Sequence, residues 1–94
     1  MDLYWILSAG VDPRPYLDAY ESRFPLLHLK DGTPTAGIET DLGQGTVDFP
    51  DILSHLRHLG SHHFVIERDQ QPHPTETANV SYDYLRGLRI APLK

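Results

Sequence analysis

The stretch Phe24-Pro25-Leu26-Leu27-His28-Leu29 is an apolar run without alternation, broken near its end by one histidine. Such a run predicts a strand that is covered on both faces, with Pro25 near its beginning. A second short apolar run covers residues 63–67 and ends in an acid. Helical and loop signals separate the two runs. This order predicts parallel strands joined by a right-handed crossover in an α/β architecture.

Helical patterns alternate with these runs. An Asp before or beside a proline opens the first two patterns, and apolar residues recur at helical spacing in all three. The second helix is expected to end at Gly60 in a left-handed conformation. The expected helices span residues 13–20, 50–59 and 75–88. The side chains expected on their buried faces are Tyr16, Leu17 and Tyr20, then Ile52, Leu53, Leu56 and Leu59, then Ala78, Tyr82 and Leu85.

Residues 30–47 contain several glycines and Pro34, and they predict a long irregular loop of the kind that often has a function. Within it, Gly43-Gln44-Gly45 fits a tight turn before the helix cap Asp48. A phosphate-binding loop is the weaker reading, because a third glycine and a preceding Rossmann strand are missing.

Composition excludes several classes of protein. The chain has 94 residues, a net charge of −5, no Cys and 39% hydrophobic residues. It is too apolar for a disordered chain, and no apolar run is long enough to cross a membrane. Without Cys, any metal site must use His and carboxylates. The acidic balance argues against a nucleic-acid partner.

The compartment stays open at this stage. No targeting segment begins at Met1, so a cytoplasmic location is the default expectation. A periplasmic parent protein is the alternative, since any signal would lie upstream of this chain.

Three residues with metal-binding side chains share one topological position. Asp2, His28 and Glu67 each lie at or just beyond the carboxyl end of an apolar segment. In parallel α/β folds the sites form at that end, where the loops converge. Two carboxylates and an imidazole suit a divalent cation such as Mn²⁺, Mg²⁺, Co²⁺ or Zn²⁺. Isolated polar residues at strand ends are the competing explanation. By contrast, His55 and His58 lack a third ligand and are expected on a solvated surface.

Several segments together resemble the later part of the sugar phosphate isomerase/epimerase family of xylose isomerase-like TIM barrels. The resemblance runs in order through almost the whole chain. The segments are Asp2-Leu3-Tyr4-Trp5, Ala9-Gly10-Val11-Asp12-Pro13, Arg23-Phe24-Pro25-Leu26-Leu27-His28-Leu29-Lys30-Asp31, Gly43-Gln44-Gly45-Thr46-Val47-Asp48-Phe49, Val65-Ile66-Glu67-Arg68-Asp69 and Ser81-Tyr82-Asp83-Tyr84-Leu85-Arg86.

This resemblance implies that residues 1–94 are the C-terminal fragment of an incomplete (β/α)8 TIM barrel, from the end of strand six through helix eight. Met1 would then be an internal methionine of a longer protein. The resemblance also implies one divalent metal ion held by Asp2, His28 and Glu67, with Glu67 as a catalytic acid or base beside a metal-polarised carbonyl. The family's first Glu ligand has no counterpart here. Residues 3–7, apolar enough for a strand, should form a loop or short helical turn.

The implied partner is a small sugar or sugar phosphate, and three residues are candidates for binding it. Trp5 lies where many epimerases carry a substrate-contacting His, and packing over the barrel mouth is its alternative role. Lys30 would neutralise a phosphate or an enolate, or else form a structural ion pair. Arg68 would line the mouth of the site, although strand alternation would turn it into the helical layer.

A second function class remains beside the isomerase reading. The chain would then be a catalytically inert fragment, or a module that self-associates through the open edge of its sheet. In either case we expect no substantial isomerase activity and at best weak metal binding from the isolated chain, because three ligands on an unclosed sheet are poorly preorganised.

Overall fold

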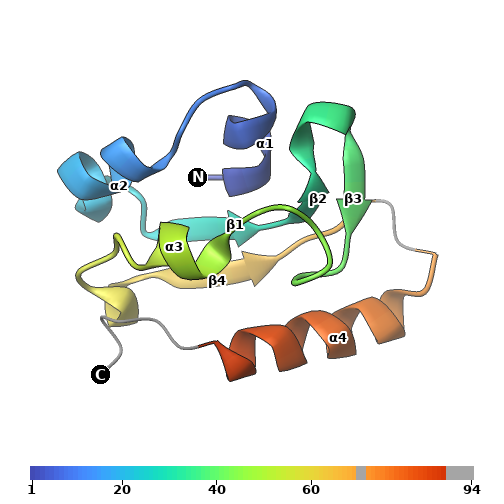
Figure 1. The fold of residues 1–94 in the computed structure, drawn as a ribbon. Coiled ribbons are helices and arrows are strands. Elements are labelled where there is room, and N and C mark those ends of the chain that lie inside the picture. Colours follow the sequence, from blue (N-terminus) through green and yellow to red (C-terminus); the bar gives the residue numbers. More distant parts are fainter. Residues whose placement is uncertain (70–71, 89–94) are drawn as a thin grey trace.

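A parallel pair of strands forms the centre of the computed structural model, which describes residues 1–69 and 72–88. Strand β1 (Leu26–Leu29) pairs with β4 (His63–Ile66), and both arrows point the same way in Figure 1. The other edge of β1 carries a parallel bridge between Asp2 and His28. The predicted parallel pairing is therefore confirmed, with the first two residues of the chain as a short third segment.

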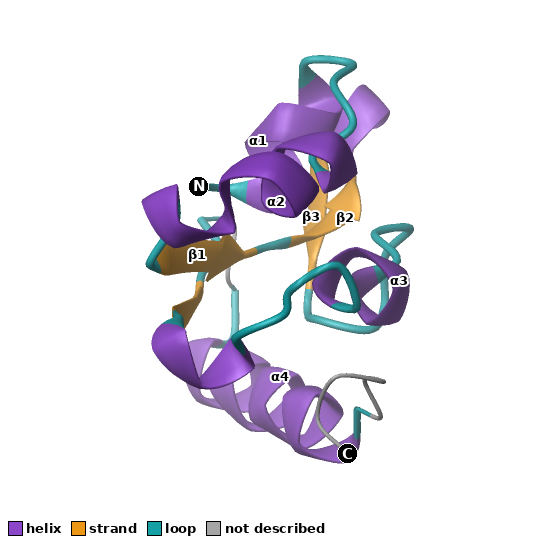
Figure 2. Ribbon diagram, turned by 90° about the vertical axis from the view of Figure 1, so that its left-hand side faces the viewer, coloured by secondary structure: helices purple, strands orange, loops and turns teal. Residues whose placement is uncertain are grey.

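Three of the described α-helices are short, and only the last one is longer than two turns. Helix α1 spans Leu3–Ser8, α2 spans Arg14–Tyr20, α3 spans Phe49–Leu53 and α4 spans Pro74–Gly87. Short 3-10 turns cover Glu21–Arg23, Pro34–Ala36 and Leu59–Ser61. Figure 2 shows α2 above β1 and α4 below it, with α3 beside the strand. None of the described helices is long and apolar enough to cross a membrane.

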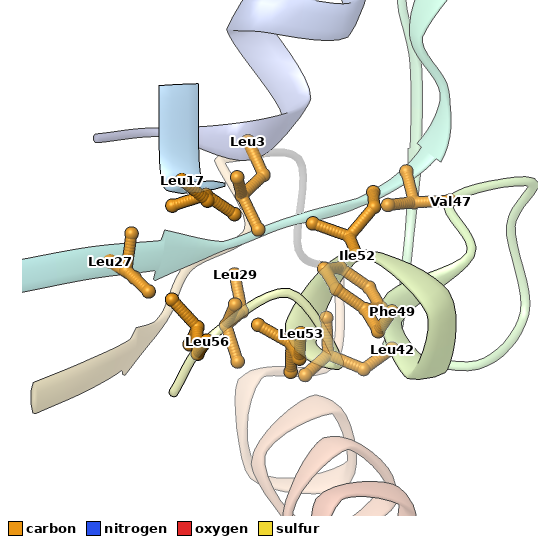
Figure 3. Close-up of a cluster of buried hydrophobic side chains, with 10 residues drawn as sticks. All are labelled: Leu3, Leu17, Leu27, Leu29, Leu42, Val47, Phe49, Ile52, Leu53 and Leu56. Atoms are coloured by element: carbon orange, nitrogen blue, oxygen red, sulfur yellow. The ribbon is translucent and has the colours of Figure 1, made fainter. Parts of the chain in front are cut away.

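One face of the parallel pair packs on the hydrophobic core. Leu27 and Leu29 of β1 are fully buried in one cluster with Leu17 of α2, Leu53 of α3 and Leu56 of the segment after α3 (Figure 3). Phe64 and Ile66 of β4 pack partly buried against the same cluster. The ten core residues are Leu3, Leu17, Leu27, Leu29, Leu42, Val47, Phe49, Ile52, Leu53 and Leu56.

The opposite face of the strands is open. Leu26 is 44% exposed and Val65 is 37% exposed, although both belong to apolar runs. The runs are typical of strands that are covered on both faces, but the described residues cover only one. Burial alternates along β1 because only one face of the strand meets the helices.

Residues 30–47 are not the structureless loop that the glycines and proline predicted. They contain an antiparallel hairpin of β2 (Asp31–Thr33) and β3 (Ile38–Thr40), beyond the carboxyl end of β1 (Figure 1). Gly37 adopts the left-handed conformation before β3. Strands of three residues are too short to give a readable alternation, which explains why the hairpin escaped prediction.

A buried carboxylate organises the loop that follows the hairpin. Asp31 accepts hydrogen bonds from four backbone N–H groups, and its side chain is inaccessible to solvent. The donors are those of Gly32 at 2.7 Å, Gly43 at 2.9 Å, Val47 at 3.1 Å and Gly45 at 3.2 Å. The preferred reading of Gly43-Gln44-Gly45 as a tight turn is confirmed. The N–H groups of Gly43 and Gly45 already have an anion, the side chain of Asp31, and that of Gln44 donates to the carbonyl of Asp41.

Helix α3 is about half the predicted length. Asp48 caps it as expected, accepting from the N–H of Asp51 at 3.2 Å. The helix ends at Leu53, and the chain then tightens, with the N–H of His55 on the carbonyl of Ile52 at 3.2 Å and that of Leu56 on Leu53 at 3.1 Å. Further along, the Glu21 carboxylate accepts from the N–H groups of Arg57 at 2.7 Å and His58 at 2.8 Å. Gly60 lies in a 3-10 turn without a positive φ, so its predicted left-handed role is wrong.

The apolar spacing predicted the wrong buried side chains in two helices, α4 and α2. In α4 the buried side chains are Thr77 and Ser81, whereas Ala78 is exposed and Tyr82 is 59% exposed. The Ser81 hydroxyl accepts from the N–H of Leu42 at 3.2 Å, which turns the helix by one position relative to the apolar stripe. In α2 only Leu17 is buried.

The start of the chain agrees with the expectation taken from the family resemblance, since the apolar residues after Asp2 form the short helix α1 and not a strand. One parallel and one antiparallel sheet of two strands each make this a mixed α/β domain. The incomplete barrel stays a prediction.

Candidate metal centre

Three segments bring Asp2, His28 and Glu67 together on the open face of the sheet. The Asp2–His28 bridge sets the first pair side by side, and the register of β1 with β4 brings Glu67, the residue after β4, to the same end. One ligand atom from each residue lies within 4.8 Å of the other two. Among the described residues this is the one His/carboxylate group found with such spacing.

Asp2 has a structural role that fixes its carboxylate. One oxygen, Oδ1, accepts a hydrogen bond from the N–H of Trp5 at 3.1 Å and so caps the first turn of α1. The other oxygen is left for a second partner. The cap holds the carboxylate toward His28 before any ligand arrives.

His28 and Glu67 are already in contact. The His28 Nδ1 lies 3.0 Å from Glu67 Oε2, and because an ionised carboxylate only accepts, the ring nitrogen carries the hydrogen. Two ligands in neighbouring positions around an ion, each at about 2.1 Å, stand about 3 Å apart. The two side chains are 30% and 34% exposed, so an ion can reach them from solvent. The donor set therefore fits a divalent cation that replaces the shared hydrogen.

Lys30 lies behind Glu67 and is fully buried. Its Nζ is 3.1 Å from Glu67 Oε1 and 2.9 Å from Asp69 Oδ2. The same ammonium faces two aromatic rings, with the Trp5 centroid at 4.8 Å and the Tyr4 centroid at 5.7 Å. Glu67 thus has one oxygen on Lys30 and the other on His28.

The ionisation of this group follows from those contacts. Burial lowers the pKa of Lys30, but hydrogen bonds to Asp69 and Glu67 raise it by more, so its pKa is raised overall. The hydrogen bond from Lys30, then that from His28, lowers the pKa of the Glu67 carboxyl. Glu67 is therefore a carboxylate and Lys30 an ammonium at neutral pH.

A second layer supports the lysine, and the residue patterns did not reveal it. The N–H of Asp69 donates to Glu39 Oε1 at 2.6 Å, and the Tyr4 hydroxyl donates to the carbonyl of Ile38 at 3.0 Å. These bonds tie the candidate site to the hairpin. Asp69 follows Glu67 by two positions, and that spacing was the one available signal that both side chains share a face.

The structure separates the three candidate substrate-binding residues. Trp5 is 51% exposed beside Lys30, and it lines an apolar hollow of about 460 Å³ next to Asp2. Lys30 is next to Glu67 but closed off from solvent. The Arg68 guanidinium instead binds Asp41 at 2.9 Å with its Nε buried and unpartnered, toward the loop after β3. Their roles in substrate binding stay predictions.

His55 and His58 are not part of this group of ligands. The His55 Nδ1 lies 2.7 Å from Asp18, and His58 contributes its backbone N–H to Glu21. The two residues do not share a helix, because α3 ends before them. The expectation that both lie on one solvated helix face is therefore wrong, because the helix is shorter than its apolar spacing predicted.

Comparison with known proteins adds no identity to this geometry. The sequence matches no family model and has no significant match among curated proteins.

Proposed function

We propose that this chain holds one divalent cation through Asp2, His28 and Glu67, as the C-terminal part of a sugar or sugar phosphate isomerase/epimerase-like barrel. The observation that carries the proposal is the convergence of these three ligand atoms from separate segments within 4.8 Å. The family resemblance of the segments around them supports the isomerase chemistry.

The proposed chemistry is proton transfer at the carbon next to a carbonyl. A bound cation would supply Lewis-acid polarisation of that carbonyl. Glu67 would take or return the proton, because a carboxylate that is ionised at neutral pH has an oxygen lone pair to accept it. Trp5 would offer its exposed indole as a platform for the sugar ring.

The isolated chain carries half of the acid/base pair that this chemistry uses in the resembling family. We therefore expect metal binding from the 94-residue chain without substantial isomerase turnover. Turnover of a ketose by the isolated chain at an enzyme-like rate would contradict the proposal that half of the acid/base pair is missing from it.

Calorimetric titration of Mn²⁺ tests the metal centre. Glu67→Gln and Asp2→Asn should each weaken binding by on the order of a hundredfold, because each removes one anionic ligand from a three-ligand set. Asn in place of Asp2 keeps an oxygen for the helix cap, so the fold should survive. Asp83→Asn is the control, because it removes an equal charge from an exposed ion pair on α4. Equal affinity in all four proteins would reject the centre.

The second candidate function is self-association of a catalytically inert fragment. The observation that favours it is the open face of the parallel pair, where Leu26 and Val65 are exposed. Within residues 1–69 and 72–88, β4 pairs with β1 alone, so its other edge can accept a strand. Light scattering and the Mn²⁺ titration on the same samples separate the two candidates. Binding of Mn²⁺ supports the first candidate in any association state, and an oligomer that binds no Mn²⁺ supports the second.

A further inference from the structure

We propose that Lys30 sets the affinity of the metal centre by sharing Glu67 with the bound ion. This inference rests on the proposed metal site and adds a tuning residue to it. Its starting point is that the two oxygens of Glu67 face different partners, Oε1 toward Lys30 and Oε2 toward His28.

The geometry limits how Glu67 can bind an ion. With Oε1 held at 3.1 Å by the ammonium, Oε2 is the oxygen that remains on the side of His28 and Asp2. Glu67 then coordinates through one oxygen rather than two. Lys30 therefore fixes both the orientation of the ligand and its denticity.

The charge of Lys30 acts against the ion. The ammonium is buried, so water does not screen it, and it lies within hydrogen-bond distance of a metal ligand. Repulsion between an ammonium and a divalent ion a few ångströms apart exceeds what one charge-assisted hydrogen bond contributes to ligand orientation. The net effect of Lys30 is to weaken binding, even though it orders Glu67.

The surroundings of Lys30 show why its charge persists. Asp69 accepts its second hydrogen bond, and the faces of Trp5 and Tyr4 lie against the ammonium. These partners stay in place whether or not Glu67 also binds an ion. Lys30 is thus a resident cation that keeps the carboxylate paired while no metal is present and lowers affinity when a metal arrives.

Removing the charge is feasible without leaving a buried anion. The Asp69 side chain is 60% exposed and the Glu67 side chain 34% exposed, so water can solvate both when the lysine is gone. Lys30→Met keeps a straight apolar stem against Trp5 and Tyr4. Lys30→Gln keeps one N–H donor for Glu67 without the charge. Arg86→Met, at an exposed ion pair on α4, removes the same unit charge elsewhere.

Mn²⁺ titrations of these three variants and of the wild-type chain test the proposal. We expect Lys30→Met and Lys30→Gln to bind Mn²⁺ on the order of tenfold tighter than the wild type, and Arg86→Met to bind equally. If both Lys30 variants bind with unchanged or weaker affinity while Glu67→Gln abolishes binding, the metal centre stands and the role of Lys30 is rejected. If no folded protein binds Mn²⁺, the metal centre itself is rejected.

A measurement on the wild-type chain covers the case in which the Lys30 variants fail to fold. The chain has two lysines, Lys30 and Lys94, so ¹⁵N-labelled lysine gives two side-chain ammonium signals. Mg²⁺ should shift the Lys30 signal while it stays protected from solvent, and Mn²⁺ should broaden it. A Lys30 signal that is indifferent to saturating Mg²⁺ would overturn the proposal.

Discussion

At the scale of single residues, the close approach between Gly45 and Asp31 is the most demanding contact in the loop before α3. A Cβ at position 45 would overlap the backbone N of Gly32 and the Oδ1 of Asp31. Neither atom can move aside, because Asp31 is buried and holds four N–H groups. Glycine is required here by space and not by its dihedral angles.

Gly45→Ala should therefore destabilise the fold by about 3 kcal/mol, as expected when a methyl group forces apart a buried hydrogen-bonded network. Urea unfolding followed by circular dichroism measures the free energy of unfolding. Gly60→Ala is the control, since a Cβ there meets open space and Gly60 has no positive φ. A loss of similar size in both variants would mean that the Asp31 loop is not the cause.

Residue patterns alone could predict which side chains gather at the site, but not how they pair. Asp2, His28 and Glu67 were predicted together because each ends an apolar run. The sharing of Glu67 between His28 and Lys30 depends on the register between two strands, which single-strand patterns do not encode.

At the scale of elements, Glu21 joins the end of α2 to the segment after α3. Its carboxylate accepts from the N–H groups of Arg57 and His58 and from the His62 ring at 2.9 Å. The other nitrogen of His62 lies 2.7 Å from the carbonyl of Phe24. Both bonds of His62 exist together only when both ring nitrogens carry hydrogen, so the pair is an ion pair.

This cluster predicts a loss of stability in acid. Burial raises the pKa of Glu21, but hydrogen bonds from Arg57, His62 and His58 lower it by more. The net result is a pKa of about 2 in place of 4.5. A carboxyl whose pKa is lower in the folded state contributes its full stability above pH 4.5 and loses it as the pH falls toward 2. Glu21→Gln should cost about 2 kcal/mol at pH 6 and much less near pH 2.5.

Urea unfolding of both proteins between pH 6 and pH 2.5 measures that difference. Asp18→Asn serves as the control, because Asp18 lies in α2 just before Glu21 and forms an exposed pair with His55. A difference between wild type and Glu21→Gln that stays constant across the pH range would contradict the assignment.

The elements themselves were predictable only where local signals dominate. The cap at Asp48 fixed the start of α3 correctly, since capping is local. The end of α3 was missed because the apolar spacing continues through Leu56 and Leu59, although the segment after Leu53 is held by Glu21, which lies far away in the chain. In α4 the buried face was shifted because Ser81, a polar residue, packs inward on Leu42.

At the scale of the whole molecule, the parallel pair presents one covered and one open face. We expect the open face to drive weak, concentration-dependent self-association of the wild-type chain, because exposed apolar strand residues favour burial. Leu26→Lys should raise the apparent dissociation constant on the order of tenfold, measured by sedimentation velocity over a range of concentrations.

Ile38→Lys is the matched control for this test. Ile38 is 54% exposed on the hairpin, away from the strand pair, so the same substitution there should leave association unchanged. Equal effects of both substitutions would mean that added positive charge, and not the open face, controls association.

The overall architecture could be predicted only for strands whose pairing partners lie in the same chain. Parallel pairing of β1 and β4 follows from two apolar runs with a long connection, and it is confirmed. Coverage of both faces was predicted from the same runs and is not found in the described residues. Those runs have the composition of strands with more neighbours than the described part of the chain supplies.

Successive side chains of β1 point to opposite faces of the sheet and have different roles. Leu27 and Leu29 face the core, whereas Leu26 and His28 face away from it. Substitutions on the outward side can therefore exchange one chemistry for another without repacking the interior. An inserted residue, by contrast, would invert the strand and exchange the two sets at once. Under selection, this strand can vary freely in what it presents to a ligand but hardly at all in its length.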